Sequence, residues 1–321
     1  MQSSENTQAR LQFRLVLVLD RASNLKSISR PCKQMPDHFV IHLASGLLLG
    51  GACLFSSMIT HTEDAADQHV EVALVSEQQA IVPGQKFLLG IRFDLQDGWH
   101  TYWVNPGDAG EPPRITWELP AGFQAGSIQW PYPARLSTPP FADFGYEHQV
   151  LLPVTVRPPS GLGAGGNEKI VARIHYLICR DVCIPGQKQL ELTLPVKNRT
   201  EPGSDAPLFK TAQQRVPRPI PNGWRISARS VGDEFQLRLR IGKFAAPPQF
   251  FPLEPEQIEN AAPQNITPTQ EGCELHLKKS NHLLKPISHL KGVIVVAGTA
   301  YLADVPVLQS FGRGLVQSKQ N

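Results

Sequence analysis

The sequence predicts an all-β protein made of β-sandwiches. Three observations support this fold class. Apolar and polar residues alternate with a period of two in several segments, which is typical of strands with one face on a core. Prolines (29) outnumber glycines (25), and both punctuate the chain between these segments. Helix-favouring runs are short and scattered, which argues against a helical bundle.

The alternation identifies individual strands in chain order. Each of these segments places branched or aromatic residues on one side and polar residues on the other. We expect strands at about 86–95, 169–178 and 188–196, and a further alternating segment covers 235–241. Turns rich in Pro and Gly between such strands favour packed sheets over βαβ units.

Composition shifts predict how the chain is organised. The polar stretch NRTEPGSDAP (198–207) separates two halves, and PLFKTAQQR after it favours a short helix. We expect a leader at 1–66, a first sandwich domain at 67–198 and a second at 205–310. The tail GRGLVQSKQN within 311–321 is expected to be flexible.

The leader contains the apolar segment 39–59, which carries no charged residue. Arg30 and Lys33 precede it and a polar stretch follows it, which is the layout of a secretory signal or an N-terminal membrane anchor. Cleavage near Ala65, lipidation at Cys53 and a translation start at Met35 all stay open. Export would place the remaining chain in the periplasm, an oxidising compartment.

Several function classes find no support. The formal net charge of +3 is small and the basic residues form no block, so no nucleic-acid partner is expected. The glycines Gly161, Gly163 and Gly166 fit a dinucleotide fingerprint, but they precede a strand rather than opening a helix, so we interpret them as a loop. Neither G-x-S-x-G nor H-E-x-x-H occurs.

One cysteine pair needs its own explanation. Cys179 ends a predicted strand, three residues follow, and Cys183 begins the return. In a hairpin the two residues would face each other at roughly 4.5 Å between Cα atoms, close to what a disulfide requires. Such a small closed loop stabilises the fold little, which suits a reversible bond better than a staple. Cys273 is solitary in the sequence.

The residues alone leave three interpretations of this pair. It is a static structural disulfide, a catalytic redox pair, or part of a metal site with His175, because these are soft or borderline ligands. A histidine on a strand need not converge on the two sulfurs, and an oxidised pair offers no thiolate. We expect no cofactor and no tight metal site in the oxidised protein.

As a whole, the chain resembles the periplasmic N-terminal part of DsbD-type thiol:disulfide interchange proteins, in the branch linked to suppression of copper sensitivity. The motifs that carry the resemblance lie within 67–307. They are GWHTYWVNPGDAGEPPRITWELPAGF, IQWPYPAR, FADFGYEHQVLLPV, HYLICRDVCIPG, FFPLEP and GVIVVAGTAYLADVPV.

The resemblance implies an immunoglobulin-like redox domain. Cys179 and Cys183 would be its catalytic pair, with Cys183 joining the partner and Cys179 resolving the intermediate. An aromatic cap loop shields the pair in this family, and Phe144, or alternatively Tyr146, corresponds best. The implied partners are a membrane-embedded electron donor and oxidised periplasmic thiol proteins.

The chain departs from typical members, since no multi-helix membrane domain and no C-x-x-C thioredoxin-like domain follow by Asn321. We therefore expect a protein-disulfide reductase component that uses a separate membrane partner. The alternatives are a periplasmic binding or assembly module with a structural disulfide, and a copper-handling protein.

Overall fold

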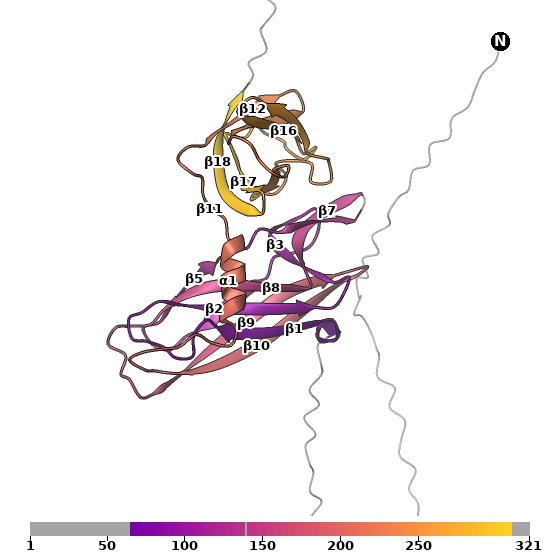
Figure 1. Cartoon of the computed structure of the whole chain (residues 1–321). Helices are drawn as coiled ribbons and strands as arrows, with labels where there is room; N and C mark the ends of the chain where they lie inside the picture. Colours follow the sequence, from indigo (N-terminus) through magenta and orange to yellow (C-terminus); the bar gives the residue numbers. More distant parts are fainter. Residues whose placement is uncertain (1–64, 139, 310–321) are drawn as a thin grey trace, which may run out of the picture. The chain divides into compact units, whose positions relative to one another are not determined.

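The computed structural model describes residues 65–138 and 140–309, and β-strands dominate this part of the chain (Figure 1). The strands form sheets in a sandwich-like arrangement, which confirms the predicted all-β class. The apolar segment 39–59 and the tail from 311 lie outside the described residues. Within the described ranges, no helix is long and apolar enough to cross a membrane.

Two sheets form the first sandwich. Their strands pair antiparallel throughout, and the orders are β1-β2-β8-β5 in one sheet and β10-β9-β3-β7-β6, with β4 also on β9, in the other. The strands are β1 (Val70–Ser76), β2 (Phe87–Leu95), β3 (His100–Gly107), β4 (Arg114–Glu118), β5 (Gln124–Ile128), β6 (Ala134–Thr138), β7 (Phe141–Glu147), β8 (Gln149–Arg157), β9 (Asn167–Cys179) and β10 (Cys183–Pro195).

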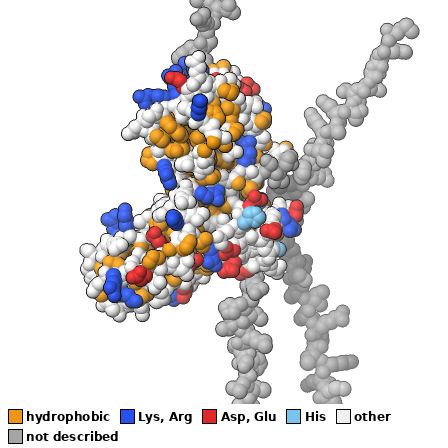
Figure 2. All heavy atoms as spheres, viewed as in Figure 1, with side chains coloured by type: hydrophobic (Ala, Val, Ile, Leu, Met, Phe, Trp, Pro, Cys, Tyr) orange, Lys and Arg blue, Asp and Glu red, His pale blue; other side chains and the backbone are white. Residues whose placement is uncertain are grey.

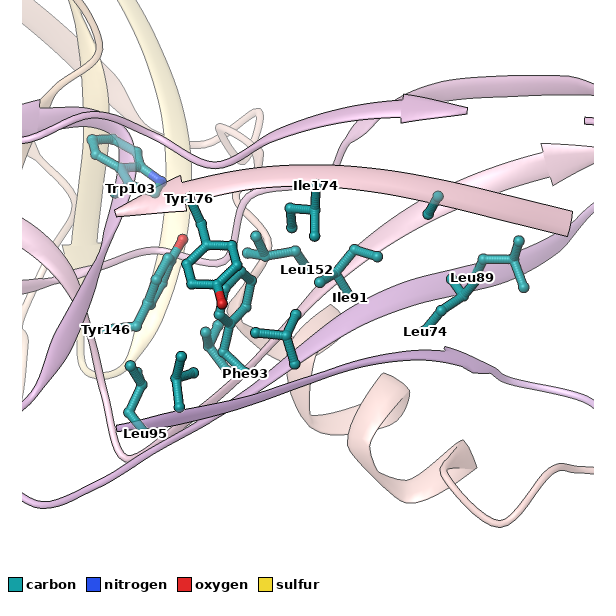
Figure 3. Close-up of a cluster of buried hydrophobic side chains, with 14 of the residues drawn as sticks. Leu74, Leu89, Ile91, Phe93, Leu95, Trp103, Tyr146, Leu152, Ile174 and Tyr176 are labelled. Carbon is teal, nitrogen blue, oxygen red and sulfur yellow. The ribbon is translucent and has the colours of Figure 1, made fainter. Parts of the chain in front are cut away.

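A core of inward-facing side chains lies between these two sheets (Figure 3). Ile91 and Phe93 of β2 and Leu152 of β8 meet Ile174 and Tyr176 of β9. The Phe93 and Tyr176 rings pack edge to face, with centroids 5.5 Å apart. Burying an aliphatic or aromatic side chain of this size contributes about 1.5–3 kcal/mol, so the alternating pattern fixes which face of each strand points inward.

The predicted short helix is present as α1 (Ala206–Arg215). Pro207 stands in its first turn, where its missing N–H costs nothing, and Phe209 and Ala212 are its buried residues. They pack on Val75, Leu88 and Leu151, which belong to the side of the β1-β2-β8 sheet that faces away from the main core. Helix α1 thus covers this second side.

The chain after α1 forms a further sheet with the order β14-β17-β18-β12-β13-β16-β15, and β11 also pairs with β18. This sheet has its own hydrophobic core, which includes Phe235, Leu237, Leu275 and Ile294. The strands are β11 (Arg218–Pro219), β12 (Arg225–Val231), β13 (Glu234–Arg240), β14 (Gln249–Pro252), β15 (Asn265–Thr269), β16 (Gly272–Lys278), β17 (His289–Val296) and β18 (Thr299–Gln309).

The strand bounds differ from the predictions mainly at β10. This strand begins at Cys183, not near 188, because Pro185 and Gly186 continue the strand instead of forming a turn. Strand β10 is at an edge of its sheet, where a missing N–H is tolerated. Gly186 lets the Tyr176 ring approach, since a Cβ there would lie 2.3 Å from the ring. The loop at 158–166, including the three glycines, joins β8 to β9 as predicted.

Charged side chains are mixed over the visible surface. Figure 2 shows Lys and Arg interspersed with Asp and Glu, in line with the formal net charge of +3. A network of this kind surrounds Arg92, which pairs with Glu71, Asp94 and Asp205 at 2.6–3.2 Å. Asp205 immediately precedes α1, so the network also fixes where the helix begins on the sheet.

Candidate functional site

The cysteine pair closes the end of the β9–β10 hairpin. Cys179 and Cys183 are register partners, joined by a disulfide, with Cα atoms 4.2 Å apart. Arg180, Asp181 and Val182 connect the two strands, and the Arg180 N–H donates to the Val182 carbonyl at 3.2 Å. The hairpin predicted from the spacing is therefore present.

The two sulfur-bearing residues differ in access to solvent. Cys179 is only 3% exposed, whereas Cys183 belongs to the exposed residues. Val182 beside it is 63% exposed, which is unusual for a large apolar side chain. An incoming thiolate therefore has access to Cys183 first, and Cys179 is the sulfur that would leave.

Alternation along β9 puts the disulfide on the face of the sheet opposite the main core. Ile174, Tyr176 and Ile178 point into the core, so Cys179 points to the other side. The same rule applies to β3, where Trp103 enters the core and Tyr102 does not belong to it. The side of the sheet that points away from the main core is its outer face. Side chains of β3 and β9 on this outer face therefore surround the disulfide.

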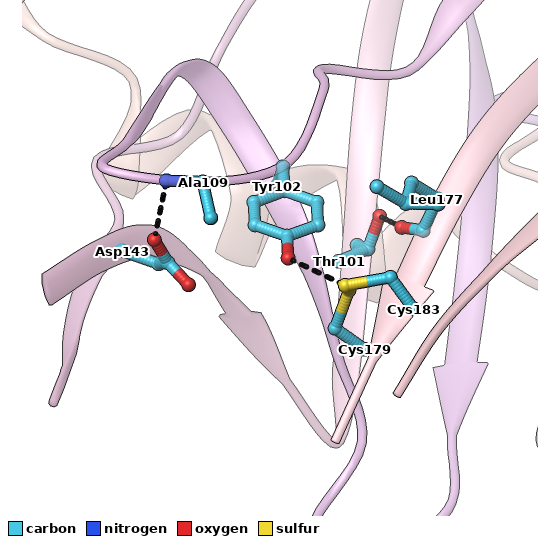
Figure 4. Close-up of a disulfide and its surroundings, with 7 residues drawn as sticks. All are labelled: Thr101, Tyr102, Ala109, Asp143, Leu177, Cys179 and Cys183. Atoms are coloured by element: carbon cyan, nitrogen blue, oxygen red, sulfur yellow. Dashed lines mark hydrogen bonds between the residues drawn. A yellow bond between two sulfur atoms is a disulfide. The ribbon is translucent and has the colours of Figure 1, made fainter. Parts of the chain in front are cut away.

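Tyr102 is the aromatic residue that contacts the disulfide (Figure 4). Its hydroxyl lies 3.6 Å from Sγ of Cys183 and donates to it, because a disulfide sulfur carries no proton. Tyr102 is 1% exposed. Burial and the nearby charge of Asp143 raise its pKa to about 12, so the hydroxyl keeps its proton at physiological pH.

Two carboxylates hold the loop that packs on Tyr102. Asp143 of β7 accepts a hydrogen bond from the Ala109 N–H at 2.9 Å (Figure 4), and Asp108 accepts one from the Ala142 N–H at 2.8 Å. Burial raises the pKa of Asp143, its hydrogen bond from Ala109 opposes this, and the charge of Asp108 adds to it. Gly110, at φ +82°, lies against the Tyr102 ring, where a Cβ would be 2.1 Å from Cζ.

His100 is the neighbour of the disulfide on the other side. It is the register partner of Cys179 on β9 and of Glu147 on β7, and its ring packs edge to face on Tyr102 with centroids 5.2 Å apart. The residue is 7% exposed. Burial lowers its pKa, and the negative charge of Glu147 partly opposes this.

The connecting turn is held by a cation–aromatic contact. The Arg180 guanidinium lies 5.4 Å from the centroid of the Trp99 ring, and His69 stacks on the same indole at 4.1 Å. Arg180 also pairs with the exposed Asp181 at 3.0 Å. These contacts fix the position of the turn next to the exposed sulfur.

The expected cap segment differs from the prediction. Residues 143–146 are part of strand β7, not a loop, and Phe144 and Tyr146 point into the core. The Phe144 ring packs on Trp103 and Phe251, and the Tyr146 hydroxyl donates to the Pro131 carbonyl at 2.6 Å. The side chains that β7 places on the disulfide side are those of the alternate residues, Asp143 and Glu147.

Two other sequence candidates lie apart from the pair. Cys273 is a buried free thiol in the second core, and burial raises its pKa to about 11. His175 is exposed on β9 and pairs in register with Arg114 and Gln187. In the part of the chain that the structure describes, no group of three or more His, Cys, Asp or Glu side chains is placed to hold a metal.

Sequence reasoning missed Tyr102, His100 and Asp143. Their signal was present in GWHTYW, where His100 and Tyr102 fall on the same side of a strand, and in FADFGY, where Asp143 alternates with Ala142 and Phe144. The sequence alone does not predict that β3 lies between β7 and β9 in the sheet. That arrangement alone brings both motifs to the disulfide.

The first sandwich thus ends one hairpin in a disulfide with one exposed and one buried cysteine, and an exposed disulfide sulfur is open to attack by a thiolate. Residues 71–195 match the family described as "Thiol:disulfide interchange protein DsbD, N-terminal". This match confirms, for that segment, the resemblance predicted from the sequence.

Among solved structures, the chain is similar to the N-terminal periplasmic domain of ScsB from Proteus mirabilis. The TM-score is 0.57 at 17% identity, over 75% of this chain and 94% of that one, which supports the fold. The major pilin subunit BcpA of Bacillus cereus (TM-score 0.24, 9% identity, 75% and 68% covered) and the periplasmic chaperone SfaE (0.20, 10%, 74% and 100%) are more distant. No curated protein matches the chain.

Proposed function

We propose that the chain is a periplasmic thiol–disulfide exchange module that passes electrons through Cys179 and Cys183. A membrane-embedded dithiol protein would reduce the pair, and the reduced pair would then reduce oxidised periplasmic proteins. The observation that carries the proposal is the unequal exposure of the two sulfurs at the hairpin end within the family-matched segment.

The unequal exposure gives each cysteine a role. In the reduced protein the Cys183 thiolate attacks one sulfur of the partner disulfide, which releases the other partner sulfur as a thiolate. The buried Cys179 then attacks Cys183, forms the internal disulfide and frees the second partner thiolate. Two electrons pass to the partner, and the module is left oxidised.

Surroundings of the hairpin support contact with a partner. Val182 and Cys183 protrude at the turn, and a hollow of about 220 Å³ lies along the same hairpin. Its lining includes Glu111, Arg114, His175 and Pro185. Polar and apolar groups around an exposed reactive sulfur suit transient docking better than permanent assembly.

The test is a trapping experiment in periplasmic extract. Cys179→Ala leaves Cys183 without its resolving partner, so we expect discrete adducts on non-reducing gels that disappear with reductant. Cys183→Ala should trap fewer, and the double variant should trap none, with Cys273 present in all three. A Cys179→Ala protein without adducts, under conditions that trap a known thiol oxidoreductase, would contradict the proposal and leave a binding module with a structural disulfide.

Export is tested separately. An alkaline phosphatase fusion at residue 200 should be active, because that enzyme requires the oxidising periplasm to form its disulfides. An inactive fusion in cells that export control fusions would place the chain in another compartment.

A further inference from the structure

A row of four side chains crosses the outer face of the first sandwich. Strand register places Glu147 opposite His100, His100 opposite Cys179, and Cys179 opposite Cys183. Directly opposed residues of neighbouring strands have Cβ atoms about 4.5–5.5 Å apart and point to the same side. The row therefore leads from an exposed carboxylate, through an imidazole, to the buried sulfur.

The imidazole in this row has an unused ring nitrogen. Nε2 of His100 is buried and has no hydrogen-bond partner among the described residues. A buried polar atom without a partner costs about 1–3 kcal/mol, so its retention in a packed site calls for a reason. Opening the disulfide would create a new polar group on the register partner of His100, the Cys179 thiol.

The chemistry of resolution needs a proton acceptor at this place. Cys179 is 3% exposed, so water has little access to it. Its thiol must lose a proton before its sulfur can attack Cys183 in a mixed disulfide. Burial disfavours a free thiolate there. A neutral imidazole on the directly opposed residue would remove this obstacle.

We propose that His100 accepts the proton of Cys179 in the resolving step, and that Glu147 stabilises the imidazolium that forms. This rests on the exchange function proposed above. The proton moves from Sγ of Cys179 to the imidazole, the bond between the two cysteine sulfurs forms, and the bond from Cys183 to the partner breaks. The leaving partner thiolate then takes up the proton, so charges and electrons balance.

Other ionisable groups near His100 have partners or stay uncharged. The Tyr102 hydroxyl on the same strand keeps its proton and faces Cys183. Arg180 pairs with Asp181 at the turn, and His148 lies 3.5 Å from Asp97 at the end of β7. Glu147, across from His100, is the carboxylate whose charge acts on it, and burial keeps the pKa of His100 below its ordinary value.

The experiment follows resolution directly with a small aromatic disulfide, dithiobis-nitrobenzoate. The reduced full chain, with Cys32 and Cys53 replaced by Ser in every sample, should release two equivalents of coloured thiolate. The first equivalent reports the attack by Cys183, and the second reports resolution by Cys179. Stopped-flow absorbance separates the two phases.

We expect His100→Gln to slow the second phase about 100-fold at pH 7, a usual contribution of a general base, and to change the first phase less than about threefold. The pH dependence of the second-phase rate distinguishes a proton acceptor from a residue that only supports the fold. The second phase of the parent protein should level off above the pKa of His100. That of the variant should keep rising with pH, because hydroxide must then remove the proton. The matched control His282→Gln, an exposed histidine outside the first sandwich, should behave as the parent.

A second phase of His100→Gln within about threefold of the parent, with the same pH profile, would overturn the inference. If this variant does not fold, the exposed Glu147→Gln serves instead. It should slow the second phase about threefold, because an exposed charge pair contributes less than about 1 kcal/mol. An unchanged second phase in that variant would also overturn the inference. Failure of Cys183 to react in the parent protein would instead count against the proposed function.

Discussion

The hydroxyl of Tyr102 lies 3.6 Å from Sγ of Cys183, while the neighbouring His100 is the register partner of Cys179. Each sulfur of the disulfide thus has its own protein neighbour on β3. The exposed sulfur accepts from a hydroxyl that keeps its proton, and the buried sulfur belongs to the register partner of His100. This division has consequences that can be measured one residue at a time.

Tyr102→Phe should reduce the reactivity of Cys183. Once the disulfide opens, the Tyr102 hydroxyl can donate to the Cys183 thiolate, and a hydrogen bond to a charged group contributes about 1.5–3 kcal/mol. Its loss raises the thiol pKa, so we expect alkylation of reduced Cys183 at pH 7 to slow about three- to tenfold. Iodoacetamide kinetics followed by mass spectrometry measure this. Tyr132 packs on Arg215 and not on the disulfide, so the control variant Tyr132→Phe should react at the parent rate.

Gly110→Ala should disturb the cover of Tyr102. Gly110 has φ +82°, and an added Cβ would lie 2.1 Å from the Tyr102 ring. Backbone strain and a clash with a buried ring together should destabilise the fold by about 2 kcal/mol or more in urea unfolding. Gly163→Ala meets nothing within 4 Å and should change stability by less than about 0.5 kcal/mol. Equal stability of the two variants would contradict the packing described for this loop.

Asp143→Asn should change how stability depends on pH. Burial raises the pKa of Asp143 in the folded protein. Its carboxyl therefore binds a proton more readily when folded, and that contribution to stability is present at low pH and lost as the pH rises through the folded pKa. The oxidised parent should lose stability relative to Asp143→Asn as the pH is raised from about 4 towards neutral. Urea unfolding across this range measures the difference.

Cys273 should be inert in the folded protein. Burial in the second core raises its thiol pKa to about 11. At pH 8 only about one molecule in a thousand then carries the thiolate, and the side chain has no solvent access. Peptide mass spectrometry after alkylation of the reduced, folded protein should show Cys183 modified and Cys273 unmodified. Labelling of both at similar rates would show that the second core opens readily.

The strands and the hairpin disulfide could be predicted because both depend on local sequence. Alternation along β2 and β9 follows from which face each residue buries, and a three-residue connection brings Cys179 opposite Cys183 whatever the rest of the chain does. The start of β10 was misplaced because Pro185 and Gly186 usually signal a turn. Here the edge position of the strand tolerates the proline, and the Tyr176 ring requires the glycine.

The surroundings of the disulfide depend on which strands are neighbours. His100 and Asp143 are 79 and 36 positions before Cys179 in the chain, and only the order β7-β3-β9 brings them together. The aromatic residues of β7 were predicted to form a cap, but alternation along that strand places Phe144 and Tyr146 on its core side. The resemblance directed attention to β7, whereas alternation along that strand determines that Asp143 and Glu147 lie on its outer side.

The disulfide joins residues only four positions apart. Cutting it frees almost no chain, and the cores on which the sandwich depends do not include either cysteine. Oxidised and reduced protein should therefore have nearly the same lifetime against proteases, and heat should inactivate both at similar temperatures. If the proposed exchange function holds, the protein can be reduced and oxidised over many cycles without refolding between them.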